Sequence, residues 1–84
     1  MDVNRKEKLL LSESIPGNAY LVLEIKDEMR LVNRLSSMGI LCGSQVEICQ
    51  NHKKQPVLLF VRDTLVAIGR EESKKIVVGG SKHE

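Results

Sequence analysis

The feature that most constrains this chain is a helix followed by a glycine stop, within residues 27–40 of its 84 residues. Leu31, Leu35 and Met38 are four and three residues apart, which places their apolar side chains on one face of an α-helix. Asp27 stands where a side-chain oxygen can accept hydrogen bonds from the free N–H groups at a helix start. The pattern therefore predicts a short amphipathic helix that begins near Asp27.

Gly39 predicts where this helix ends. The residue after the last turn commonly adopts a left-handed conformation, which glycine reaches without a Cβ penalty. In such a stop the next residue, here Ile40, folds back onto the residue five positions earlier, Leu35. We therefore expect Leu35, Gly39 and Ile40 to be structural residues.

Two further glycines predict tight turns. Residues 15–18 place Pro16 and Gly17 at the second and third turn positions, which is the chemistry of a type II turn. Residues 41–44 repeat this arrangement, with Gly43 at the third position and Cys42 where a proline would preset the backbone. Gly17 and Gly43 are thus expected to be structural as well.

Apolar residues recur in short runs that predict about five antiparallel strands. In residues 19–25 the alternate set that includes Tyr20 and Val22 ends in Glu24, so we expect the odd positions inside and Tyr20 and Val22 outside. Residues 76–78 form the last strand, with Val77 outside. The other side chains expected to point inward are Ala19, Leu21, Leu23, Ile25, Val46, Ile48, Val57, Leu59, Val61, Val66 and Ile68.

The segments between these runs predict the connections. Residues 51–55 form a hairpin loop, and Pro56 suits a strand start because it has no amide proton to donate. Asp63 and Thr64 turn the chain, and residues 70–75 make one helical turn. The predicted fold class is all-β with a short helix, a small, half-open SH3-like barrel of about five antiparallel strands.

Length and composition fit a single small domain. With 84 residues and 42% apolar content, we expect a barrel domain at residues 9–78 between flexible tails at 1–8 and 79–84. The longest apolar runs are five residues, whereas about 20 are needed to span a bilayer. With neither a spanning segment nor a signal peptide, we expect a cytoplasmic protein without membrane insertion, whose two cysteines are reduced.

Charge and residue types disfavour several functions. The net charge of +2 comes from interleaved signs, and Tyr20 and Phe60 are the only aromatic residues, so we expect no nucleic-acid partner. No serine or cysteine forms a recognisable catalytic motif with a histidine and no phosphate-binding glycine loop occurs, so we expect no enzyme.

Candidate metal ligands are dispersed. His52, His83, Cys42 and Cys49 are the obvious ones, but they do not form the two closely spaced pairs typical of a preformed site. His52 also lies beside Lys53 and Lys54, which would repel a cation. We therefore predict no native metal site and no cofactor, with an adventitious surface ion as the alternative.

The order of features from residue 11 to 78 resembles the ferrous iron transport protein A (FeoA) family. The matching positions are Leu11, Ile15-Pro16-Gly17, Arg34-Leu35-x-x-Met38-Gly39-Ile40, Gly43, Val46, Ile48, Pro56, Ala67-Ile68, Glu72 and Ile76-x-Val78. Departures occur at Ser14, Cys42 and Asp63, where leucine, proline and glycine are common in that family. They concern local turns and not the fold.

The resemblance implies a fold and a function. The fold is the same SH3-like barrel, and the function is that of a non-catalytic accessory protein of FeoB, the membrane ferrous iron transporter with a cytosolic GTP-binding domain. The alternative is an SH3-like regulatory domain akin to the carboxyl-terminal domain of metal-dependent repressors. That class needs a helix-turn-helix reader, which residues 1–8 are too short to supply. A weak homo-oligomer is also left open.

A partner surface is predicted from apolar side chains that alternate away from the core. Small barrels bind partners through loops and open strand faces. The predicted partner-binding residues are Leu41, Cys42, Gly43, Leu58, Phe60 and Leu65. The alternative is that the helix and the N-terminal leucines cover the outward residues, including Tyr20 and Val77.

Overall fold

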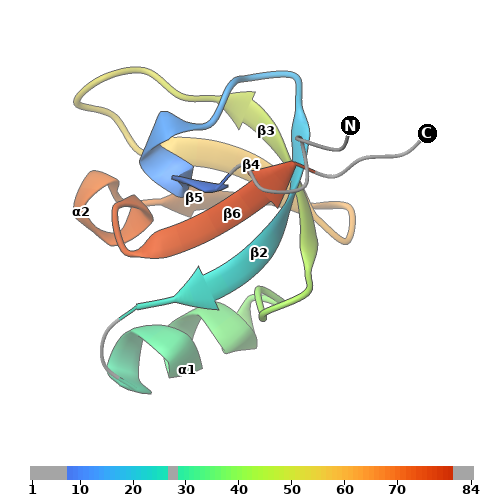
Figure 1. The fold of residues 1–84 in the computed structure, drawn as a ribbon, viewed down its shortest axis with the longest axis vertical. Helices are drawn as coiled ribbons and strands as arrows, with labels where there is room; N and C mark the ends of the chain where they lie inside the picture. The colour runs from blue at the N-terminus through green and yellow to red at the C-terminus, as the bar shows by residue number, and fades with distance from the viewer. Residues whose placement is uncertain (1–7, 27–28, 81–84) are drawn as a thin grey trace.

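The fold is one antiparallel sheet that coils around a single core, seen in a computed structural model that describes residues 8–26 and 29–80 (Figure 1). The strand order is β1-β6-β2-β3-β4-β5. The elements are β1 (Lys8–Leu10), η2 (Leu11–Glu13), β2 (Ala19–Ile25), α1 (Met29–Ser37), β3 (Gln45–Gln50), β4 (Val57–Val61), β5 (Thr64–Ile68), α2 (Arg70–Ser73) and β6 (Ile76–Gly80). The small, mostly-β architecture confirms the predicted fold class.

The strand that the sequence pattern did not predict is β1. It has three residues and pairs with β6, with Leu9 opposite Val78 and Leu10 opposite Val77. So short a segment carries no periodicity of its own, and its pairing depends on a strand almost 70 positions later in the chain. Strands β1 and β6 extend to Lys8 and Gly80, beyond residues 9–78 on both sides; the rest of the two predicted tails lies outside the described residues.

The predicted helix stop is present. Leu31 and Leu35 of α1 are buried, and Gly39 has a φ of 89°. The Gly39 N–H donates to the Ser36 carbonyl at 3.0 Å and the Ile40 N–H to the Leu35 carbonyl at 2.9 Å, the two bonds of a Schellman motif. Ile40 and Leu35 belong to the same buried cluster, as predicted. Asp27, the predicted cap, lies outside the described residues.

Both predicted glycine turns are also present. Gly17 and Gly43 have φ values of 92° and 95°. The Asn18 N–H donates to the Ile15 carbonyl at 3.1 Å, and the Ser44 N–H to the Leu41 carbonyl at 2.9 Å. The second turn therefore forms with Cys42 in place of proline.

The inward and outward assignment of β2 was wrong. Tyr20 and Val22 are buried, at 5% and 2% exposure, whereas Leu23 is 43% exposed and the other odd positions, Ala19, Leu21 and Ile25, are only half-buried. The register shifts between Val22 and Glu24, so Leu23 and Glu24 both face outward. The Tyr20 hydroxyl accepts a hydrogen bond from the Ile15 N–H at 3.0 Å, which satisfies the polar end of the buried ring.

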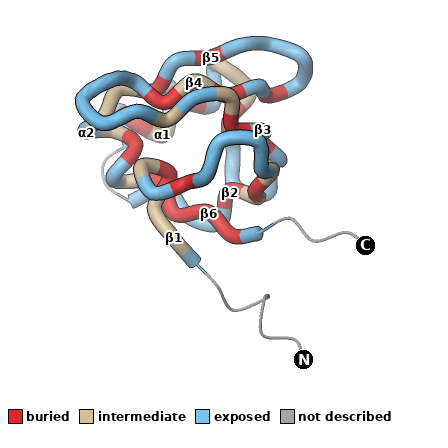
Figure 2. The backbone as a smooth tube through the Cα atoms, turned by 90° about the horizontal axis from the view of Figure 1, so that it is seen from above, coloured by how far each residue is buried: buried red, intermediate tan, exposed pale blue. Residues whose placement is uncertain are grey.

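Val77, which was predicted on the face of the last strand that points away from the core, is 8% exposed but lies outside the core cluster that holds Ile76 and Val78. Within the sheet, β6 lies between β1 and β2. Val77 is flanked there by Leu10 on one side and Glu24 on the other. Ile76 and Val78 are buried with it, so most of this strand is enclosed, as Figure 2 shows by its continuous buried colour.

Strands β3, β4 and β5 follow the predicted alternation. The buried residues here are Val46, Ile48, Val57, Leu59, Val61, Val66 and Ile68. The turn between β4 and β5 is Arg62–Asp63, one residue earlier than predicted, and both residues have positive φ, 53° and 65°. This left-handed pair matches the twist of a two-residue hairpin. The predicted helical turn in residues 70–75 is α2.

Gly39→Val is expected to destabilise the protein by about 1–2 kcal/mol. A Cβ at Gly39 would come no closer to a neighbour than 3.8 Å, to Arg62 Cδ, so the cost is the left-handed backbone rather than a clash. Urea denaturation of both proteins measures the change. Gly39→Asn is the matched control, because asparagine tolerates this conformation better, and it should lose less. Equal midpoints for Gly39→Val and wild type would contradict the left-handed stop.

Candidate partner-binding surface

Four apolar side chains lie together on the outer face of the β4–β5 hairpin. Phe60 is 41% exposed and stands directly opposite Leu65, which is 54% exposed. Leu58 is half-buried and stands opposite Ala67, which is exposed. Opposite residues of antiparallel strands bring their side chains into contact range. We call Leu58, Phe60, Leu65 and Ala67 the hairpin patch.

The strand pleat explains why this patch is on the outside. Val57, Leu59 and Val61 alternate with the patch residues on β4 and are at most 2% exposed, so the inward face of the strand is already filled. The alternative was that α1 and the N-terminal leucines cover all outward residues. The described part of the chain leaves Phe60 and Leu65 exposed, so this alternative is wrong for these two residues. The sequence prediction did not include Ala67. Its position two residues after Leu65 was the signal that both side chains lie on the same face of the strand.

The turn after the helix lies next to the hairpin. Leu41 is 47% exposed, and Cys42 and Gly43 are exposed. These three residues line a shallow depression of about 400 Å³ together with Ser44, Gln45, Val61 and Arg62. Because Val61 and Arg62 lie at the turn of the β4–β5 hairpin, this depression borders the turn end of the hairpin.

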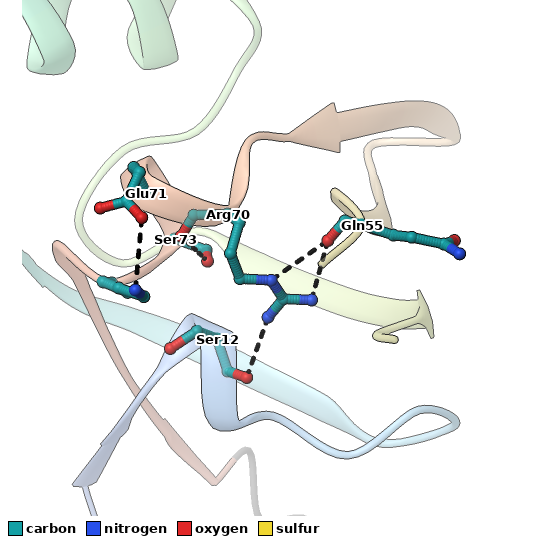
Figure 3. A network of polar contacts seen from close by, with 6 residues as sticks. Ser12, Gln55, Arg70, Glu71 and Ser73 are labelled. Carbon is teal, nitrogen blue, oxygen red and sulfur yellow. Dashed lines mark hydrogen bonds and ion pairs between the residues drawn. The ribbon is translucent and has the colours of Figure 1, made fainter. Parts of the chain in front are cut away.

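A network of hydrogen bonds around Arg70, which we call the Arg70 staple, fixes the end of the hairpin opposite the turn (Figure 3). The Arg70 guanidinium donates to the carbonyls of Ser12, His52 and Gln55 and to Asn51 Oδ1, at 2.8 Å for the last. Asn51 Nδ2 in turn donates to the Ser12 and Ser14 carbonyls at 3.0 and 2.7 Å. These contacts join α2, the β3–β4 loop and η2. The sequence did not indicate this role for Arg70 or Asn51.

The structure does not bring the candidate ligands Cys42, Cys49 and His52 into a metal site. Among residues 8–26 and 29–80 no three His, Cys, Asp or Glu side chains gather where they could hold an ion. Cys42 and Cys49 are free thiols, one exposed and one half-buried. His83 lies outside the described residues, so the absence of a native metal site stays a prediction.

No helix in the described part of the chain is long and apolar enough to cross a membrane.

The hairpin, the helix stop and all but the final residue of β6 lie within a region that matches a known family. The FeoA domain model matches residues 9–79. The chain belongs to the FeoA domain family. The resemblance drawn from the sequence is thus confirmed, and it ties the chain to a family associated with ferrous iron uptake.

Solved structures share this FeoA fold. An iron uptake regulatory protein (FeoA) is 25% identical with a TM-score of 0.84, and the match covers 89% of this chain and all of that one. A FeoA-like protein from Clostridium acetobutylicum is 22% identical with a TM-score of 0.77, over 94% of each chain. No curated protein sequence matches this chain.

The same fold occurs in a larger regulator. A manganese-dependent transcriptional repressor is 16% identical with a TM-score of 0.80, over 88% of this chain. The match spans 42% of the repressor, so the FeoA domain described here corresponds to less than half of that protein. At this identity the likeness concerns the fold alone.

Proposed function

We propose that this FeoA-family protein is a non-catalytic cytosolic accessory protein of ferrous iron uptake, which acts by contact with the cytosolic region of a FeoB-type transporter. The observation that supports it is the hairpin patch, where Phe60 and Leu65 expose apolar surface that the core does not use. In so small a domain most apolar side chains are needed for stability. Clustered exposed apolar residues therefore favour a partner surface.

Phe60 is the residue best placed to anchor such a contact. Its ring is partly covered, at 41% exposure, and it stands opposite Leu65 on one side and Glu47 on the other. A ring that is already supported loses little conformational entropy when a partner covers it. Aromatic residues dominate the binding energy of interfaces for this reason. Leu41 and Cys42 line the depression beside the hairpin turn and are the expected periphery.

Phe60→Ala is expected to weaken binding to the soluble cytosolic region of the transporter by about 2 kcal/mol, roughly a thirtyfold rise in Kd. Isothermal titration measures the affinity, and thermal melting shows whether the fold is intact. Leu23→Ala is the matched control, because Leu23 is 43% exposed on β2, outside the patch. It should bind like wild type. Equal affinities for Phe60→Ala and Leu23→Ala would contradict this surface.

The second candidate is a regulatory domain of the repressor type. Its support is the TM-score of 0.80 to the manganese-dependent repressor. That likeness concerns the fold, whereas the family model that matches residues 9–79 is the FeoA domain. We therefore place ferrous iron uptake first.

A further inference from the structure

Strand β5 forms one edge of the sheet. It is the last strand in the order β1-β6-β2-β3-β4-β5 and pairs with β4 alone among the described residues. The two-residue turn at Arg62–Asp63 is closed by Val61 and Thr64, which makes them a hydrogen-bonded pair. Since such pairs alternate along an antiparallel ladder, Leu59–Val66 and Val57–Ile68 are hydrogen-bonded pairs too.

Leu65 and Ala67 therefore turn their backbone groups away from β4. Both belong to the non-hydrogen-bonded pairs of the ladder, opposite Phe60 and Leu58. Within the described chain no other backbone bond is made by either residue. Two N–H groups and two carbonyls thus stand free along the edge, beside the apolar side chains of the hairpin patch. A free edge of this kind is a template for another strand.

The charges along this edge are uneven. At the end where β5 begins, Arg62 and Asp63 offset each other. At the end where it finishes, Lys53 and Lys54 lie exposed in the β3–β4 loop, which Arg70 joins to α2. Among the described residues, Lys53, Lys54 and Arg70 form no ion pair with a carboxylate. The nearby carboxylate of Glu71 lies 3.3 Å from Lys74 Nζ instead. This end of the edge is therefore basic.

We infer that β5 takes up an extended segment of the partner as an added strand, apolar at alternate positions and acidic at the end that reaches Lys53 and Lys54. The inference rests on the proposed function, since it assigns the partner's form at the same surface. Main-chain bonds to Leu65 and Ala67 give affinity, and the patch receives the alternate apolar side chains. The basic end selects the acidic residues.

A second copy of this chain fits the edge less well. Two β5 strands that use both Leu65 and Ala67 of each copy must pair around Val66. That register sets the Arg62–Asp63 end of each copy, whose charges offset each other, beside the basic end of the other copy. A second copy therefore brings no net negative charge to Lys53 and Lys54. A separate acidic segment does.

Amide hydrogen exchange of the intact protein tests the added strand. The probe is a synthetic peptide of about ten residues, two aspartates followed by alternating valine and threonine, a form suited to strand addition. The Leu65 and Ala67 amides should exchange fast in the free protein and at least about tenfold more slowly with the peptide. The Val66 amide, bonded within the hairpin, should not change. Protection of Leu65 and Ala67 in the free protein would show that the edge is already covered and would overturn the inference.

Ala67→Pro removes one free N–H without removing a bond between β4 and β5, and proline is tolerated at such edge positions. It should weaken peptide binding at least about tenfold, while Ala67→Val, which keeps the N–H, should not. The double variant Lys53→Glu, Lys54→Glu should instead prefer a peptide whose two aspartates are replaced by lysines. Equal binding of both peptides by both proteins would refute the acidic end.

Binding of two variants to the transporter's cytosolic region distinguishes this inference from the proposed function. Thermal melting first shows that Ala67→Pro is folded. If Phe60→Ala then weakens binding to the transporter's cytosolic region and Ala67→Pro does not, the proposed surface is correct and the added strand is wrong. If neither variant weakens binding, the proposed function fails at this surface and the inference fails with it.

Discussion

Val22→Asp is expected to unfold the protein, whereas Leu23→Asp, one position further along β2, is expected to leave it folded. Val22 is 2% exposed and packs within the single core, so the new carboxylate would lie there without a partner. The cost of burying an unpaired charge is several kcal/mol, comparable to the roughly 5–15 kcal/mol that stabilises a whole domain. Leu23 is 43% exposed, so an aspartate there stays in water.

Circular dichroism melting and size-exclusion chromatography distinguish the two outcomes. We expect no cooperative transition for Val22→Asp and a transition within a few degrees of wild type for Leu23→Asp. The pair is its own control, because both changes put the same residue into the same strand. A folded Val22→Asp together with an unfolded Leu23→Asp would mean that Leu23, and not Val22, faces the core.

The opposite burial of Val22 and Leu23 is an example of what local sequence cannot predict. The Gly39 stop, the turns at Gly17 and Gly43 and the phases of β3 to β5 follow from local signals, a positive φ or a strict alternation. Residues 19–23 are five apolar residues in a row, so neither phase is favoured until Glu24. The register shift beside Glu24 depends on pairing with β6, which local sequence does not encode.

The same distinction applies to the candidate surface. The exposure of Phe60 and Leu65 was predictable because β4 alternates and its inward set fills the core. The free edge at Leu65 and Ala67 required the strand order and the position of the turn, which shifted by one residue from the prediction. The Arg70 staple was invisible because most of its acceptors are backbone carbonyls, which every residue carries.

Arg70→Met is expected to destabilise the protein by about 3 kcal/mol. The methionine keeps much of the apolar stem but removes a guanidinium that donates to three carbonyls and to Asn51 Oδ1. Each such bond contributes about 0.5–1.5 kcal/mol net, and the lower part of that range applies because the site is only partly buried. Urea denaturation followed by circular dichroism measures the loss.

Two further variants show whether the loss comes from the staple rather than from a missing charge. Arg70→Lys keeps the charge but lacks the planar fork that reaches several acceptors at once, so it should recover less than half of the stability. Arg62→Met removes an exposed arginine on the same hairpin, whose guanidinium makes no hydrogen bond to the described residues, and should cost less than about 0.5 kcal/mol. Full recovery by Arg70→Lys would mean that charge alone matters at this end of the hairpin. In that case the join between α2, the β3–β4 loop and η2 would not depend on guanidinium geometry.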